Sequence, residues 1–130
     1  MTPRDGLKLA LAQPLIREAD TGDGRVEDAT AMIREAGDRG ADLVLFPESF
    51  PGPIRAGEFR DAEPDISLAC REAGTAACWG RIEKGEDGRF RTVALLTSVS
   101  GERIGRYVRS HPATGDVHPV LSGVPMAPGE

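Results

Sequence analysis

Short apolar runs alternate with amphipathic stretches along this chain, and their order predicts its elements. The run LALA within residues 7–12 predicts a strand, and DLVLF at 42–46 predicts another. Between them, apolar residues recur at helical spacing and predict a helix over 25–37, with Asp23 as its N-cap and Arg25 among the charged residues on its outer side. Strand, helix and strand with short connections form a βαβ unit, so we expect the two strands to be parallel.

The second half of the chain alternates in the same way. Apolar residues on one face predict a short helix over 65–73, and AACWGRIE predicts a strand at 76–83. A tight turn, GEDG, precedes a fourth strand at 91–99, and RIGRYV predicts a fifth at 103–108. The expected fold class is therefore α/β.

Composition narrows the class of protein. The chain has 130 residues, enough for one domain, with 39% apolar and 28% charged residues, which is typical of globular proteins. The net charge is −5 and no basic cluster occurs, which argues against nucleic acid and membrane surfaces as partners. No apolar run is long enough to span a bilayer, and two cysteines do not make a disulfide framework. Because Asp5 and Lys8 interrupt the N-terminal stretch, we expect no signal peptide. We expect a cytoplasmic protein.

Glu48 is the first candidate for chemistry. It follows the apolar run Leu43 to Phe46 and Pro47, at the carboxyl end of an expected central strand. Folds of the α/β class collect ligands and catalytic groups at this edge of the sheet, and a carboxylate buried there can serve as a general base. The alternative is a solvated loop carboxylate after a strand.

Metal and thiol chemistry have weaker support. His111, Asp116 and His118 have a spacing that fits no common metal site, so we expect no metal. Cys70 and Cys78 occupy apolar positions of the second helix and the third strand. Both are expected to be small core residues, because an activated thiolate needs an electropositive and accessible position.

Four segments occur in an order that is typical of one family. LALAQ, GADLVLFPESFPG, WGRIEK and SGERIGRYVRSHP together resemble the carbon–nitrogen hydrolase (nitrilase) superfamily. The resemblance covers essentially all 130 residues and corresponds to about the first half of that family's domain. It implies the N-terminal half of an α-β-β-α sandwich, that is, one mixed sheet with two helices on one face. Residues 1–130 are then a partial carbon–nitrogen hydrolase domain, ending before the strand that bears the nucleophile.

The resemblance also implies an active site. The family cleaves non-peptide C–N bonds of amides, nitriles and carbamoyl compounds with a Glu–Lys–Cys triad and no cofactor. Glu48 matches the glutamate by its FPE motif. Tyr107 and His111 match the motif around the lysine, but Arg109 stands in the lysine position. We expect Glu48 and Arg109 to lie side by side at the ends of neighbouring strands.

The nucleophilic cysteine of the family has no counterpart here, since neither Cys70 nor Cys78 has its motif or its place in the chain order. One interpretation is an amidase-like enzyme portion, inactive as an isolated chain, that acts on a small amide, nitrile or carbamoyl compound when the missing half is supplied. The other is a non-catalytic half-domain for binding or assembly. In the family, the second half of the domain covers one face of this sheet. Under both interpretations we therefore expect this face to be covered by self-association or by a complementing chain.

Overall fold

The computed structural model describes residues 6–17, 20–53, 58 and 60–111. The described residues form the elements that the apolar pattern predicts, each within a few residues of its expected bounds. In chain order these are β1 (Leu9–Leu11), α1 (Gly22–Asp38), β2 (Leu43–Leu45), α2 (Glu63–Ala73), β3 (Ala76–Lys84), β4 (Phe90–Thr97) and β5 (Arg103–Val108).

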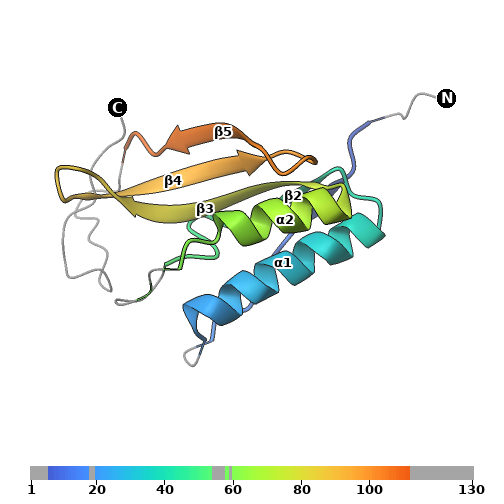
Figure 1. Cartoon of the computed structure of the whole chain (residues 1–130), viewed down its shortest axis with the longest axis horizontal. Coiled ribbons are helices and arrows are strands. Elements are labelled where there is room, and N and C mark those ends of the chain that lie inside the picture. Colours follow the sequence, from blue (N-terminus) through green and yellow to red (C-terminus); the bar gives the residue numbers. More distant parts are fainter. Residues whose placement is uncertain (1–5, 18–19, 54–57, 59, 112–130) are drawn as a thin grey trace.

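The strands form one mixed sheet in the order β1-β2-β3-β4-β5. The first three strands are parallel, which confirms the expected βαβ arrangement, and the last three pair as antiparallel hairpins. Both helices lie on the same face of this sheet (Figure 1). The fold is thus α/β with two helices on one face, as the sequence predicts.

The N-terminus of α1 corrects one prediction. Thr21, rather than Asp23, is the N-cap: its backbone is extended, with φ −108° and ψ 160°, and its hydroxyl accepts a hydrogen bond from the Gly24 amide at 3.0 Å. Asp23 lies inside the first turn, where a carboxylate interacts favourably with the helix dipole. The sequence contains both residue types close together, and only the backbone geometry decides between them.

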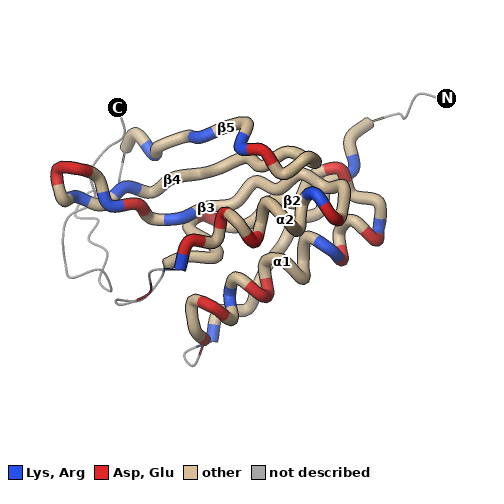
Figure 2. The backbone as a smooth tube through the Cα atoms, viewed as in Figure 1, with Lys and Arg blue, Asp and Glu red and all other residues tan. Residues whose placement is uncertain are grey.

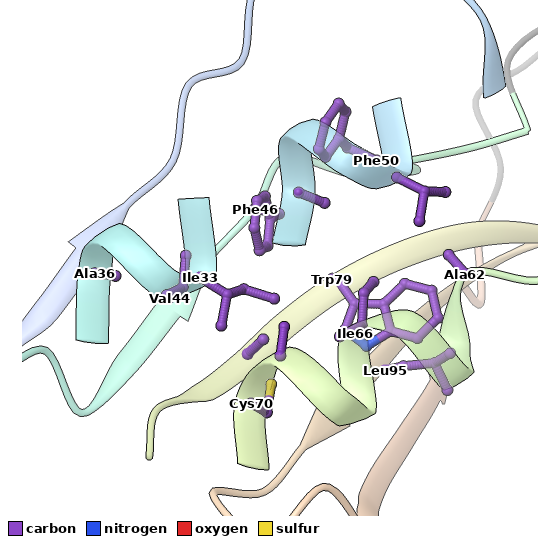
Figure 3. Packing of buried hydrophobic residues seen from close by; sticks show 14 of the residues in the cluster. Ile33, Ala36, Val44, Phe46, Phe50, Ala62, Ile66, Cys70, Trp79 and Leu95 are labelled. Carbon is purple, nitrogen blue, oxygen red and sulfur yellow. The ribbon is translucent and has the colours of Figure 1, made fainter. Parts of the chain in front are cut away.

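The hydrophobic core lies between the helices and the sheet. Ile33 of α1 and Ile66 of α2 are fully buried, and they pack with Val44, Trp79 and Leu95 from three adjacent strands (Figure 3). The buried Trp79 indole donates a hydrogen bond to the Thr97 hydroxyl at 3.0 Å, so its polar atom is satisfied within the core. The buried residues Val44, Trp79 and Leu95 of β2, β3 and β4 therefore face α1 and α2.

The opposite face of the sheet is also apolar, and no described helix or strand covers it (Figure 1). Alternation along β2 separates the two faces, since Val44 is 1% exposed and the adjacent Leu45 is 40% exposed. Strand register aligns one row of residues across this face, formed by Leu11, Leu45, Cys78, Leu96 and Gly105. We call this surface the open face.

Charges lie mainly outside these two apolar surfaces. Acidic and basic residues are interspersed along both helices and at the hairpin between β3 and β4, whereas β2 and most of β4 carry none (Figure 2). Ion pairs join the sheet to α2 at Glu63 in the first turn of the helix. Arg103 of β5 donates two hydrogen bonds to the Glu63 carboxylate at 2.7 and 2.5 Å, and Arg81 of β3 lies 3.8 Å from it. These hydrogen bonds from Arg103 hold the pKa of Glu63 below its ordinary value.

We predict that this pair stabilises the fold in a pH-dependent way. Because the pKa of Glu63 is lowered in the folded state, its contribution is present above the ordinary value of 4.5 and is lost as the pH falls below it. Glu63→Gln should lower the free energy of unfolding by about 1 kcal/mol at neutral pH, since the pair is partly screened by solvent. Urea unfolding at neutral pH and at about pH 3 measures the difference, which should shrink at the lower pH.

The matched control is Glu72→Gln, the same substitution on the same helix. Glu72 pairs with Arg34 at 3.5 Å and both side chains are about half exposed. We expect its effect to stay below about 0.5 kcal/mol at either pH. Equal effects of the two substitutions would contradict a specific role for the Glu63–Arg103 pair.

Candidate functional site

Glu48 lies in a tight turn that follows β2. The turn runs from Pro47 to Phe50 and is closed by a hydrogen bond from the Phe50 amide to the Pro47 carbonyl at 3.2 Å. Ser49 has a φ of +62°, a left-handed conformation that favours glycine or asparagine over serine. On either side of the turn, the buried rings of Phe46 and Phe50 stack with their centroids 5.6 Å apart (Figure 3). The turn that carries Glu48 is therefore held at both ends by the core.

The middle of β3 fixes the position of this turn. The Gly80 amide donates a hydrogen bond to the Phe50 carbonyl at 2.9 Å. A Cβ at Gly80 would lie 2.7 Å from the Ser49 nitrogen, closer than real Cβ atoms approach a backbone atom. Glycine at position 80 thus allows the turn to pack directly on β3. The sequence carried a signal for this, because an isolated glycine inside a strand often marks a close backbone approach.

Arg109, at the end of β5, lies beside Glu48. It directly follows β5, and its amide donates to the Thr92 carbonyl at 2.9 Å, which extends the pairing of β5 with β4. The distance from Arg109 Nη1 to Glu48 Oε1 is 3.4 Å, so the two side chains lie together as expected. The prediction that they follow neighbouring strands is wrong, because β3 and β4 lie between β2 and β5 in the sheet.

Of the two environments left open for Glu48, a buried carboxylate or a solvated one, the structure has the solvated one. The Glu48 side chain is 61% exposed and that of Arg109 is 36% exposed. The reason is the turn itself: Phe46 and Phe50 point into the core, and Glu48 between them is carried toward solvent. Strand alternation predicts burial only as far as the strand continues, and β2 ends at Leu45.

A cavity of about 470 Å³ lies beside the pair on the open face. Glu48 and Arg109 line it together with Tyr107 and Cys78. The Tyr107 hydroxyl is exposed and lies 3.3 Å from the Ser110 hydroxyl. The cavity therefore combines an acid, a fixed cation and a phenol with an apolar floor.

The sequence matches the carbon–nitrogen hydrolase family over residues 8–128. The chain belongs to the carbon–nitrogen hydrolase family. No curated protein gives a match to the sequence.

Solved structures of carbon–nitrogen hydrolases share the fold. A variant of the amidase from Nesterenkonia sp. AN1, described with acrylamide added to its active-site cysteine, is 21% identical with a TM-score of 0.75, over 96% of this chain and 50% of that one. A second variant of that amidase, in complex with butyramide, is 21% identical with a TM-score of 0.73, over 95% of this chain and 49% of that one. A carbon–nitrogen hydrolase from Helicobacter pylori G27 is 14% identical with a TM-score of 0.75, over 95% of this chain and 45% of that one. The chain spans about half the length of these proteins.

The two cysteines of this carbon–nitrogen hydrolase chain lie in different places. Cys70 is fully buried in α2, as expected, and burial raises the pKa of its thiol to about 11. Cys78 lies on the open face and is partly exposed, so the prediction that it is a core residue is wrong. Its neighbours Ala77 and Trp79 are the buried residues of that stretch of β3. Partial burial also raises the pKa of the Cys78 thiol, so neither cysteine is activated as a thiolate.

Metal and membrane candidates gain no support. Within the described residues, no group of three or more His, Cys, Asp or Glu side chains is placed to hold a metal ion. His111 is exposed, while Asp116 and His118 lie outside the described residues. No described helix is both long enough and apolar enough to cross a membrane.

We predict that Gly80→Ala moves the turn that carries Glu48. The added methyl group meets the backbone of Ser49, which cannot yield as a flexible side chain can. We expect the free energy of unfolding to fall by about 1–3 kcal/mol. Two-dimensional NMR should show shifts of the Ser49 and Phe50 amides together with the loss of stability in urea.

Gly105→Ala is the matched control, because it adds the same methyl group to the adjacent part of the sheet. There the nearest atom is the Leu96 Cβ at 3.2 Å, a milder approach than the 2.7 Å to the Ser49 nitrogen at Gly80, so a shift of a few tenths of an ångström relieves it. Its effect should be smaller and should leave the Ser49 and Phe50 amides in place. A Gly80→Ala variant with normal stability and an unchanged turn would show that the close approach is not a constraint.

Proposed function

We propose that this chain supplies the acid–base half of a carbon–nitrogen hydrolase active site. The observation that carries the proposal is the meeting of Glu48 and Arg109 at the rim of one cavity, with Nη1 and Oε1 3.4 Å apart. The two residues come from elements that are far apart in the sequence and correspond to the FPE and Tyr-x-x-x-His motifs of the family.

In this proposal Glu48 is the general base. Its carboxylate takes the proton from an attacking thiol and returns it to the leaving amine, a role that requires access to substrate and to the nucleophile. Arg109 donates hydrogen bonds to the oxyanion of the tetrahedral intermediate. Because a guanidinium stays protonated at all accessible pH values, Arg109 stabilises charge but passes no proton, unlike a lysine in this position.

The proposed substrate is a small amide, with a nitrile or carbamoyl compound as the chemical alternatives. The structurally similar Nesterenkonia amidase is described with acrylamide and with butyramide, which supports the amide. In this proposal the nucleophile is a cysteine of the complementing half, since the only cysteines of residues 1–130 are Cys70, which is buried, and Cys78, whose thiol pKa is raised by partial burial. Residues 1–130 then act as a partial domain that a complementing half completes.

A second candidate function is a non-catalytic assembly module. The open face favours it, because Leu9, Leu11 and Leu45 are exposed on adjacent strands. A contiguous apolar surface of this kind marks a contact with another protein segment. The contact partner is then a complementing chain or a second copy of this chain.

An experiment on the native polypeptide distinguishes the two candidate functions. The polypeptide is affinity-purified from its cell of origin, its mass and sequence are determined by mass spectrometry, and its activity is assayed with butyramide. Amide hydrolysis that depends on a cysteine and is lost in Glu48→Gln, with Glu27→Gln on the exposed side of α1 as control, supports the enzyme. Hydrolysis that survives Glu48→Gln, or the absence of amide hydrolysis by the native polypeptide together with every chain that copurifies with it, overturns it.

A further inference from the structure

Arg25 is a fully buried charged residue in the first half of α1. The helical pattern placed it on the outer side, yet the residue is 0% exposed. Removing a guanidinium from water costs several kcal/mol unless strong hydrogen bonds replace the lost hydration. The placement therefore needs an explanation that helix periodicity does not supply.

Within the described residues, both polar contacts of the Arg25 side chain are with the segment that follows Glu48. Its Nε donates a hydrogen bond to the Pro51 carbonyl at 3.1 Å. Its Nη2 forms an ion pair with the Glu58 carboxylate, which is also largely buried. Nη1 is buried and has no hydrogen-bond partner in the described part of the chain. One side chain of α1 thus binds two points of the segment after the turn.

Two adjacent carbonyls of this segment are held by different elements. The Phe50 carbonyl accepts from the Gly80 amide of β3 at 2.9 Å, and the Pro51 carbonyl accepts from Arg25 of α1 at 3.1 Å. The peptide between them is therefore clamped between the sheet and the helix, directly after the turn from Pro47 to Phe50. We call these two hydrogen bonds the Phe50–Pro51 clamp.

We propose that Arg25 is a positioning residue for Glu48 that acts through the Phe50–Pro51 clamp. The left-handed Ser49 costs backbone free energy, so the turn keeps its shape only where its surroundings hold it. Arg25 supplies the hold from the helix side, which fixes the direction in which Glu48 leaves the turn toward Arg109. The inference rests on the proposed role of Glu48, but the contact geometry does not depend on that role.

Arginine suits this task better than lysine does. The guanidinium presents Nε and Nη2 in a rigid fork, so one side chain bonds the Pro51 carbonyl and the Glu58 carboxylate at once. A lysine has a single nitrogen at the end of a flexible stem, and it retains the charge while losing the fixed geometry. Arg25→Lys therefore tests the clamp and keeps the positive charge.

Amide hydrogen exchange on the chain measures the clamp directly. In Arg25→Lys we expect the Phe50 and Gly80 amides to exchange about 10-fold faster than in the wild type, after correction for any change in global stability. The Ile66 amide, which bonds to the Ala62 carbonyl at 3.0 Å within α2, reports the global change. A purely structural role for Arg25 would accelerate all three amides by the same factor.

Two controls isolate the clamp. Arg34→Lys makes the same substitution on the same helix at a half-exposed position and should leave the Phe50 and Gly80 amides unchanged. Glu58→Gln removes the charge partner but keeps the bond from Nε to the Pro51 carbonyl, so these amides should change less than 2-fold. Equal acceleration in Arg25→Lys and Glu58→Gln, or no local acceleration in Arg25→Lys, overturns the proposal.

Wild-type exchange decides the question should Arg25→Lys fail to fold. In that case the Phe50 and Gly80 amides must open at the free energy of the Ile66 amide, the reporter of global unfolding, or close to it. Opening of these two amides at a much lower free energy than that of the Ile66 amide overturns the proposal. Amide hydrolysis that survives Glu48→Gln would instead refute the proposed function and leave the exchange result standing.

Discussion

We expect the purified 130-residue chain to hydrolyse neither butyramide nor acrylamide. Treatment with iodoacetamide should leave the background rate of ammonia release unchanged. A thiol hydrolase needs an accessible thiolate. Cys70 is sealed in the core with a pKa of about 11, and burial raises the pKa of Cys78 as well. Losing the nucleophile of such an enzyme typically lowers kcat by about six orders of magnitude. Release of ammonia from either amide is the measurement.

Cysteine variants provide the control for this prediction. Cys78 lines the same cavity as Glu48, so it is the thiol that would act if any in the described residues did. Cys78→Ala should leave the background rate of ammonia release unchanged, and so should Cys70→Ala. An amidase rate that disappears in Cys78→Ala would contradict the prediction and would make Cys78 a nucleophile from an unexpected position in the fold.

The local pattern of apolar and polar residues is enough to predict the helices and strands. Apolar residues recur at helical spacing over residues 25–37, and β2 to β4 are apolar runs between turn residues. The pattern therefore predicts α1 and these strands close to their observed bounds. The approach of Arg109 to Glu48 could be predicted only through the family motifs. No local pattern says which two strand ends meet across a sheet.

Predictions about individual side chains failed where tertiary contacts override periodicity. Arg25 is buried on a helix position that the pattern assigns to solvent, because the segment after Glu48 covers it. Glu48, for which the sequence leaves both environments open, is exposed because β2 stops at Leu45 and the chain turns before the carboxylate. Cys78 faces the cavity because the side chains of β3 alternate between two apolar faces of the sheet. An apolar strand with two apolar faces gives no sequence signal for which face is covered.

The open face leads to the prediction with the largest effect on the physical behaviour of the chain. Leu9, Leu11 and Leu45 form an exposed apolar surface beside Cys78, and contiguous apolar surfaces favour association. We expect the purified chain to associate as its concentration rises. Light scattering after size exclusion should give a mass above 13.8 kDa, and a hydrophobic dye should bind.

Adjacent residues of β2 provide matched variants for this test. Leu45→Lys places a charge on the open face, where the side chain is already 40% exposed, and should shift the chain toward monomer with little loss of stability. Val44→Ala alters the buried face of the same strand, where the side chain is 1% exposed. It should lower the free energy of unfolding by roughly 2 kcal/mol and leave association unchanged until the chain unfolds.

Alkylation of the two cysteines provides a second measurement of association through the open face. Cys78 lies on the open face, so its alkylation by iodoacetamide should slow as the concentration of the chain rises and the face becomes covered. Cys70 is buried against the helices at every concentration and should stay unlabelled in the folded chain. In Leu45→Lys the labelling of Cys78 should lose its concentration dependence, because the contact that protects it is weakened. A chain that stays monomeric, binds no dye and protects Cys78 at all concentrations would show that a single copy covers its own open face, and the need for a complementing half would fall with it.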